Sequence, residues 1–116
     1  MVLVILPWSA KAEWIEYATM GNGDVHFYDN SRIEKNGHLL KVWNRIRYKS
    51  SVMGASSYQS LVKIDCSEHT KIIMQNTFYT DRGWRIPAMA TDIKEKPKMN
   101  IKENSATDLL TDILCK

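Results

Sequence analysis

Apolar and polar side chains alternate most regularly between Leu40 and Lys49, within a stretch that begins at His38. The even positions are apolar apart from Asn44, and the odd positions are basic apart from Trp43. A period of two over this length predicts a β-strand with one face buried and the other in water. The buried row is Leu40, Val42, Asn44, Ile46 and Tyr48, and the row in water is Lys41, Trp43, Arg45, Arg47 and Lys49.

Further β-rich stretches flank this strand, and turn signals separate them. Gly21–Asp24 and Asn36-Gly37 predict hairpin turns, while the serine-rich segment Ser50–Ser57 predicts a flexible loop. The stretches are Trp14–Thr19, Val25–Tyr28, Arg32–Glu34, Tyr58–Cys66, Lys71–Thr80 and, confined to an edge by Pro87, Trp84–Ala90. This spacing predicts an antiparallel meander of about five to six strands.

The stretch Tyr58–Cys66 also has two distinct faces. Its core-facing row is Tyr58, Val62, Ile64 and Cys66, and the residues that point away are Gln59, Lys63 and Asp65. The outward row would place Lys63 beside the basic row of the long strand, on the same face of the sheet.

The pattern changes to helical spacing near the end of the chain. Residues 92–103 are lysine-rich and predict a surface loop, and Ser105-x-x-Asp108 then matches a helix-capping motif. The apolar residues that follow at helical spacing are Ala106, Leu109, Leu110, Ile113 and Leu114. They predict one helix packed on the sheet, so the fold class is α+β.

The first residues have the features of an export signal. An apolar run ends at Pro7 and is followed by Ala10-x-Ala12, which predicts a signal peptide over residues 1–12, cleaved after Ala12, and one domain over 13–116. The apolar run is short and lacks a basic region before it, so a start upstream of Met1 stays open. The alternative is a buried N-terminal strand.

Charge and cysteine content narrow the class of protein. Lysine and arginine number 16 against 13 acidic residues, a near balance that gives no support to a general polyanion-binding role such as nucleic-acid binding, although a local row of charges could still matter. Outside the signal, no apolar run is long enough to cross a bilayer. Cys66 and Cys115 are far apart, which favours a disulfide in an oxidising compartment over a metal site; two free buried thiols are the alternative. We therefore expect an exported protein of the periplasm or cell surface.

Several short sequence features resemble those of the bacterial surface-adhesin protein E family. They are Tyr28-x-x-x-x-Ile33, Gly37, Val42-Trp43, Tyr58-x-Ser60, Ile64-Asp65-Cys66, Tyr79 and the terminal Leu114-Cys115. The resemblance implies a short exported protein with an antiparallel sheet, a helix and a disulfide between Cys66 and Cys115. The family takes its name from an adhesin that binds host matrix proteins.

No catalytic or metal-binding motif is evident. His26, His38 and His69 fall in separate segments without chelating spacing, and we expect them to be exposed turn residues. The serines around Gly54 form no nucleophile elbow and are expected to belong to a loop. The sequence therefore predicts a protein that is not an enzyme and that holds no cofactor or metal.

The basic row is the candidate binding surface. Its members, with Lys63 beside them, are Lys41, Trp43, Arg45, Arg47 and Lys49. Spaced cations with a tryptophan among them would suit a sulfated glycan or an acidic segment of a host matrix protein. The alternative is a solvated sheet face, and a second function is a periplasmic envelope protein that dimerises through Trp43 and Leu61.

Overall fold

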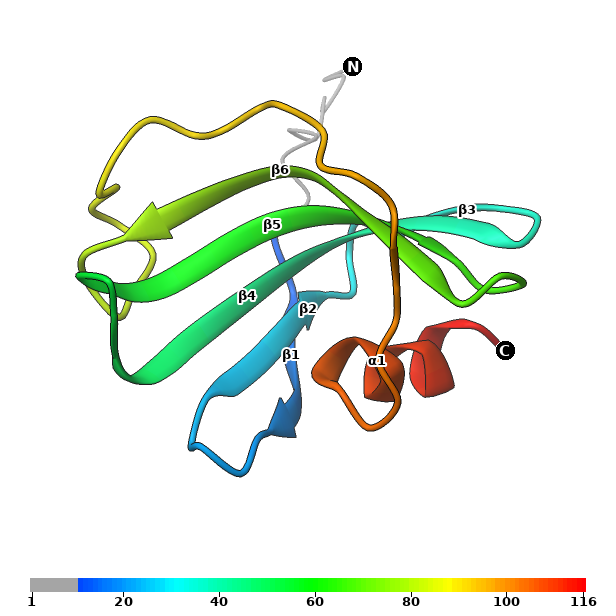
Figure 1. Ribbon diagram of the computed structural model, residues 1–116, viewed down its shortest axis with the longest axis horizontal. Coiled ribbons are helices and arrows are strands. Elements are labelled where there is room, and N and C mark those ends of the chain that lie inside the picture. Colours follow the sequence, from blue (N-terminus) through cyan, green and yellow to red (C-terminus); the bar gives the residue numbers. More distant parts are fainter. Residues whose placement is uncertain (1–10) are drawn as a thin grey trace, which may run out of the picture.

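A computed structural model describes residues 11–116, so most of the predicted signal peptide lies outside the described residues. The chain forms a seven-stranded antiparallel sheet followed by one helix (Figure 1). The elements are β1 (Trp14–Thr19), β2 (Val25–Asp29), β3 (Glu34–Asn36), β4 (Leu39–Val52), β5 (Ala55–Asp65), β6 (Thr70–Tyr79), β7 (Met99–Asn100) and α1 (Ala106–Leu114).

The sheet is a meander built around the long β4–β5 hairpin. Its strand order is β1-β2-β4-β5-β6-β7, and β3 pairs with β4 beside β2. β2 pairs with residues 44–47 of β4, and β3 pairs with residues 39–41. Both lie on one edge of β4 because the chain turns back twice before that strand begins. The predicted fold class is confirmed.

The serine-rich segment is not a loop, so that prediction is wrong. β4 continues to Val52 and β5 begins at Ala55, which leaves only Met53 and Gly54 as the turn. Ser57 and Ser60 are buried within β5. Ser57 is covered by the loop after β6, where its hydroxyl donates to the Asp81 carbonyl.

The predicted strand over Trp84–Ala90 is also wrong. The segment runs back along the outer edge of β6 as a loop and makes two isolated bridges, Tyr79 with Pro87 and Asn76 with Asp92 (Figure 1). Trp84 has a φ of 55°, a left-handed conformation that interrupts an extended strand. The lysine-rich segment that follows contributes the short strand β7.

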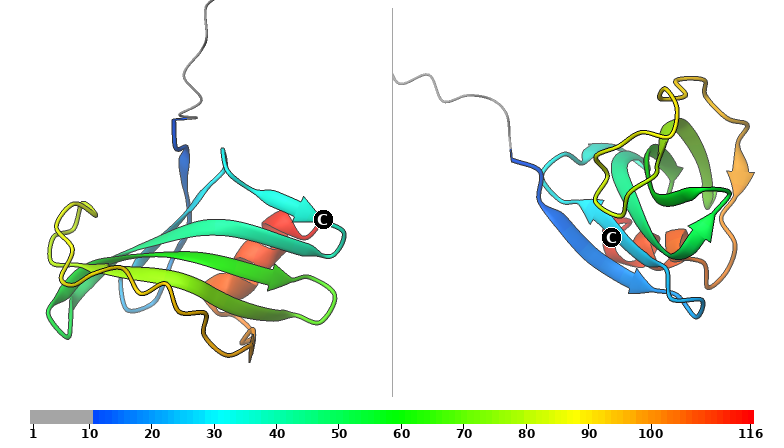
Figure 2. Two further views of the ribbon diagram at one scale, coloured as in Figure 1. Left: turned by 90° about the horizontal axis from the view of Figure 1, so that it is seen from above. Right: turned by 90° about the vertical axis from the view of Figure 1, so that its left-hand side faces the viewer.

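Helix α1 lies against one face of the strongly twisted sheet, here called the helix face (Figure 2). Its N-cap is Ser105, whose side chain accepts a hydrogen bond from the Asp108 amide, as the sequence predicts. Leu109 and Ile113 are 39% and 47% exposed, so the predicted apolar stripe is too wide. Only a narrow row faces the sheet, namely Ala106, Leu110, Thr111 and Leu114.

The core lies between this row and the helix face of β2, β4 and β5. Its buried members are Tyr28, Leu40, Val42, Val62, Ile64, Ile101, Leu110 and Leu114. Asn44 interrupts the apolar row of β4, and its side-chain oxygen accepts a hydrogen bond from the Tyr17 hydroxyl at 3.0 Å. The period-two pattern therefore assigned this face correctly.

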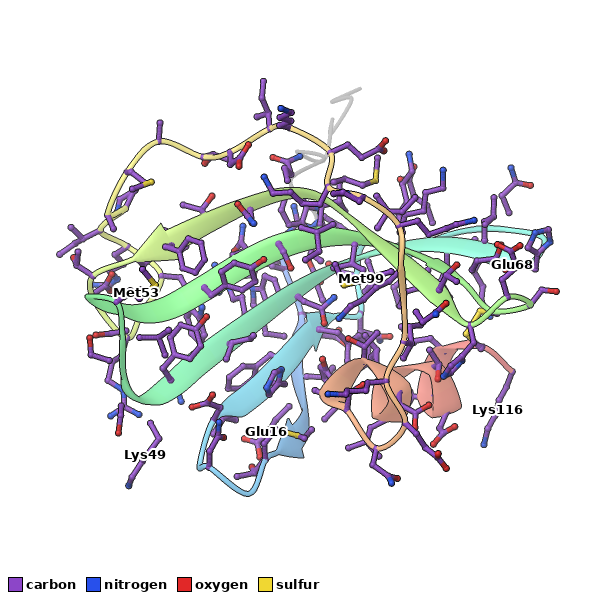
Figure 3. The ribbon with its side chains drawn as sticks, in the orientation of Figure 1. Glu16, Lys49, Met53, Glu68, Met99 and Lys116 are labelled. Carbon is purple, nitrogen blue, oxygen red and sulfur yellow. A yellow bond between two sulfur atoms is a disulfide. The ribbon has the colours of Figure 1, made fainter. Side chains whose placement is uncertain are left out.

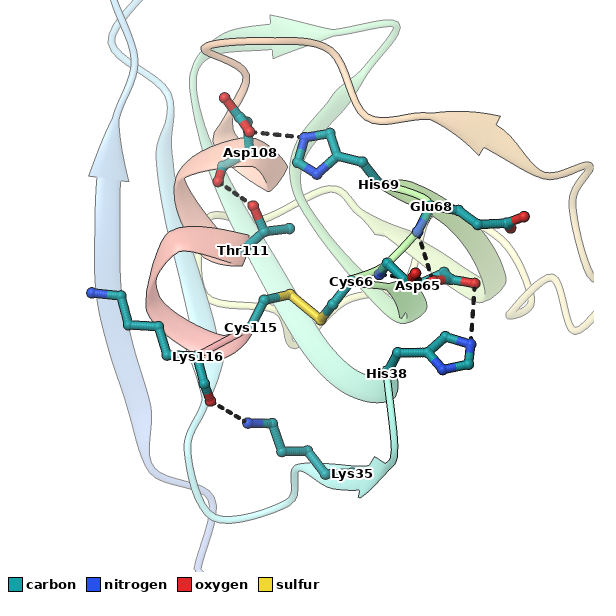
Figure 4. Close-up of a disulfide and its surroundings, with 11 residues drawn as sticks. Lys35, His38, Asp65, Cys66, Glu68, His69, Asp108, Thr111, Cys115 and Lys116 are labelled. Atoms are coloured by element: carbon teal, nitrogen blue, oxygen red, sulfur yellow. Dashed lines mark hydrogen bonds and ion pairs between the residues drawn. A yellow bond between two sulfur atoms is a disulfide. The ribbon is translucent and has the colours of Figure 1, made fainter.

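A disulfide between Cys66 and Cys115 ties the helix end to the end of β5 (Figure 4). The bond is flanked by a 2.9 Å contact between His69 Nε2 and Asp108 Oδ1. It closes a loop of 49 residues, which in the chain-entropy treatment stabilises the fold by about 4 kcal/mol. Because both cysteines are in this bond, the alternative of two free buried thiols is excluded.

Candidate functional site: the outer face of the sheet

The basic row of β4 lies on the face opposite α1, here called the outer face. Strand pairing sets Lys41 opposite Lys63, Trp43 opposite Leu61, and Arg45 opposite Gln59. Directly paired residues of neighbouring strands point to the same side of a sheet. The structure therefore brings Lys63 beside the row, but it divides the row into three different environments.

Arg45 and Arg47 lie in an aromatic layer rather than in open solvent. The Arg45 guanidinium is 4.1 Å from the ring centre of Trp14 and 4.6 Å from that of Trp84. Arg47 is 5.1 Å from Trp84 and 5.3 Å from Phe27. We call these five residues the Trp84 stack. Full exposure of the two arginines, as the sequence pattern predicts, is wrong, because the stack half-buries both.

Polar contacts fix the geometry of the Trp84 stack. Arg45 Nε donates to Gln59 Oε1 at 2.8 Å, and Trp84 Nε1 donates to the Tyr58 carbonyl at 3.0 Å. Phe27 packs edge-on against Trp84. Burial lowers the pKa of Arg45 from its ordinary value, although a guanidinium stays charged at neutral pH. These arginines serve mainly to build the outer layer.

Asp29 anchors the neighbouring corner of the outer face and is fully buried. Its carboxylate accepts hydrogen bonds from the Glu13 amide, from the amide and hydroxyl of Ser31, and from Arg32 Nε. Burial alone would raise the pKa of Asp29, but these hydrogen bonds lower it from 3.8 to about 2. This network positions Arg32, whose guanidinium lies 5.5 Å from the ring centre of Trp43.

Lys49 stands apart from the other predicted site residues. It lies near the tip of the β4–β5 hairpin, and its stem passes so close to Gly23 that a Cβ there would be 2.9 Å from its Cγ. Figure 3 shows it at the same end of the molecule as Met53 and remote from Glu68. At about 3.3 Å per residue, roughly 26 Å separates Lys41 from Lys49, so one small ligand cannot contact both.

The remaining residues form a compact surface at the other end of β4. We call it the lysine–tryptophan patch, and its members are Arg32, Glu34, Lys41, Trp43, Leu61 and Lys63. Two adjoining hollows of about 480 and 350 Å³ share Glu34 and Lys41 among their lining residues. Among the described residues, neither Lys41 nor Lys63 forms a salt bridge. Positive charge is therefore available for a ligand at this position.

The histidines are not all exposed turn residues, so that prediction is wrong in part. His38 is exposed, whereas His26 lies half-buried within β2 and His69 contacts Asp108. Burial lowers the pKa of His26. Within residues 11–116, no group of three histidine, cysteine or acidic side chains is arranged to hold a metal ion. Over the same range, no helix has the length and apolarity needed to span a membrane.

Sequence reasoning missed the residues that cover and shape the outer face. Trp14, Phe27 and Trp84 reach it from β1, β2 and the loop after β6, and Arg32 reaches it from the turn before β3. The alternation in β2 places Phe27 on this face and is the one local signal available. The position of Trp84 depends on a left-handed loop conformation, which no motif in the sequence predicts.

Comparison with known proteins agrees with this architecture. The sequence profile of the surface-adhesin protein E family matches residues 14–116. No curated protein sequence matches the chain. A structure of Haemophilus influenzae protein E superposes with a TM-score of 0.66 at 11% identity, covering 97% of this chain and 90% of that one. A second crystal form gives 0.65 at 13% identity, covering 99% and 96%.

The family profile places the chain in the class of surface adhesins, and in this chain a disulfide tethers the single helix to an antiparallel sheet. The match extends over nearly all of the described chain. The chain belongs to the surface-adhesin protein E family.

Proposed function

We propose that this protein is exported and that its lysine–tryptophan patch binds a sulfated glycan or an acidic segment of a host extracellular-matrix protein. Family membership supports the adhesive role, and the pairing of Lys41 with Lys63 supports the location. Two like charges directly opposite each other destabilise a sheet. An anionic group bound between the two lysines would remove their mutual repulsion and attract both of them.

The surroundings of the two lysines suit such a ligand. Trp43 offers an aromatic ring beside the charges, and Arg32 is held over that ring by Asp29. The two hollows give room for a sugar ring or an extended side chain. Glu34 lies opposite Lys41 and would repel a ligand group placed directly over it. The sulfate or carboxylate is therefore expected nearer Lys63.

The test is a double variant, Lys41→Ser with Lys63→Ser, assayed on immobilised heparin and on matrix proteins. We expect binding to weaken roughly tenfold, because each of these half-buried surface charges contributes about 1 kcal/mol or less. The free energy of unfolding should stay level or rise slightly as the like charges are removed. Wild-type binding should also fall between low and physiological salt, since exposed charges are screened within about 8–10 Å.

The matched control is Lys94→Ser with Lys102→Ser, which changes the net charge equally at lysines outside the patch. Equal weakening by both double variants would show that binding follows net charge and that the patch is not the site. Unchanged binding by the Lys41 and Lys63 variant would lead to the same conclusion.

A second candidate function is dimerisation through the outer face in the periplasm. Trp43 and Leu61 are cross-strand neighbours that line one hollow, so they could meet the same residues of a second copy. Sedimentation of the wild type and of Trp43→Ser decides this. A dimer that Trp43→Ser converts to a monomer would support the envelope function.

A further inference from the structure

The end of the β4–β5 hairpin carries apolar side chains that the protein leaves in water. Met53, at the tip, is 102% exposed, and its neighbour Val52 is 43% exposed. The loop after β6 adds Ile86 and Met89, which are 58% and 70% exposed. Figure 3 shows Met53 at the end of the molecule opposite Glu68.

Strand pairing and backbone hydrogen bonds place Ile86 near the base of the hairpin, whereas Met89 lies farther from the tip, since the Ala88 amide donates to the Phe78 carbonyl. Ser57 pairs with Tyr79, and the Ser57 hydroxyl donates to the Asp81 carbonyl, so the loop after β6 starts beside the base of the hairpin. The Thr80 amide donates to the Ile86 carbonyl at 2.8 Å, which holds Ile86 at that level. The tip extends roughly 7–10 Å further along the strand direction.

The residue at the tip is the wrong one for the turn it occupies. Met53 and Gly54 have φ values of 50° and 85°, as in a two-residue hairpin turn with both central residues left-handed. Asn or Gly is favoured at the first of these positions, and a large side chain is strained there. An exposed methionine therefore stabilises neither the turn nor the core, and a contact outside the molecule would account for it.

Basic side chains surround the base of this apolar tip. Lys49, Arg82 and Arg85 are exposed, and none of them has a salt-bridge partner among the described residues. The nearby Asp81 carboxylate instead accepts hydrogen bonds from the amides of Gly83, Arg85 and Ile86. Asp24, which accepts a hydrogen bond from the Lys49 amide, and Asp81 keep their negative charges, so these three basic residues exceed the two acidic ones by a single positive charge.

We propose that the β4–β5 tip inserts into the interfacial region of a bilayer that contains anionic phospholipid. The apolar side chains would enter to a depth of about 5–10 Å while the basic residues meet lipid phosphates. A two-residue turn offers too little area for a stable protein interface, which needs about 800 Å² on each partner. Insertion requires only a few apolar side chains and a matching charge.

Sedimentation with phospholipid vesicles tests the proposal. We expect the wild type to bind vesicles containing about 30% phosphatidylglycerol and to bind pure phosphatidylcholine weakly. Met53→Asn should weaken the partition about tenfold or more, because it removes the most exposed apolar side chain. Arg82→Ser with Arg85→Ser should weaken it by about fivefold per arginine.

The Asn substitution also separates binding from folding. It creates an Asn-Gly turn, which suits this hairpin, so the unfolding midpoint should stay level or rise. Ile93→Asn is the matched control: Ile93 is 80% exposed, but the adjacent Asp92 bridges to Asn76 farther along β6 from the tip. It should bind vesicles like the wild type.

Three results would overturn the proposal. They are no vesicle binding by the wild type, unchanged binding by Met53→Asn, and an equal loss in Ile93→Asn. Loss of matrix-protein binding in Met53→Asn without any vesicle binding would assign the tip to a protein partner instead. The Lys41 and Lys63 variant should keep vesicle binding, so failure here is distinct from failure of the proposed adhesive function.

Discussion

Replacing Trp84 by Ala should destabilise this protein more than any other substitution on the outer face. The indole contacts two guanidinium groups, each worth about 0.5–1 kcal/mol, and packs edge-on against Phe27 for about 1 kcal/mol. Its hydrogen bond to the Tyr58 carbonyl adds about 1 kcal/mol. The expected loss is about 3 kcal/mol in the free energy of unfolding.

Urea denaturation followed by far-UV circular dichroism measures this loss in the free energy of unfolding. In thermal unfolding, Tm should fall by roughly 15 °C for a domain of this size. Trp43→Ala is the matched control on the same face. Trp43 contacts a single guanidinium, that of Arg32, so its loss should cost only about 1 kcal/mol. A cost below about 1 kcal/mol for Trp84→Ala, or equal costs for both, would refute the view that the Trp84 stack is a second packed layer.

Two further predictions concern the corner around Asp29. Its folded-state pKa of about 2 lies below the ordinary 3.8, so its contribution of about 2 kcal/mol is present above about pH 4 and lost as the pH falls towards 2. Unfolding free energies measured across this window should show the loss, and Asp29→Asn should flatten it; an equally steep profile in that variant would assign the loss to other groups. We also propose that export removes residues 1–12, since the first described contact to the sheet is made by the Glu13 amide. N-terminal sequencing of the exported protein should begin Glu13-Trp14-Ile15, and a start at Met1 would contradict it.

Much of the fold could be predicted because its signals are local. Alternation between Leu40 and Tyr48 reports directly which side chains face the core, and burial of Leu40 and Val42 confirms it. Ser105 and Asp108 marked the helix start through a capping interaction that spans only three residues. Cys66 and Cys115 are the only two cysteines, so once export to an oxidising compartment was expected the disulfide had a single possible pairing.

The candidate site was predicted only in part because its environment is not local. Arg45 and Lys41 belong to the same alternating row, yet one is enclosed by Trp14 and Trp84 and the other lacks a salt-bridge partner among the described residues. The difference arises from segments 31 to 39 positions away from Arg45 in sequence, at positions 14 and 84, and alternation carries no information about them. In the same way, Ser57 was assigned to a loop because serine is common in loops, whereas the covering loop after β6 buries it.

The Cys66–Cys115 bond also determines what a protease can do to this molecule. The exposed loop after β6 presents Arg82 and Arg85 as cleavage positions for a trypsin-like enzyme, and both lie between the two bonded cysteines. A cut there leaves one covalent molecule, because the strands before the cut and the helix after it stay joined through sulfur. A trypsin-like protease could therefore cut the loop without releasing either piece. Cleaved protein should therefore run as two bands on a denaturing gel only after reduction.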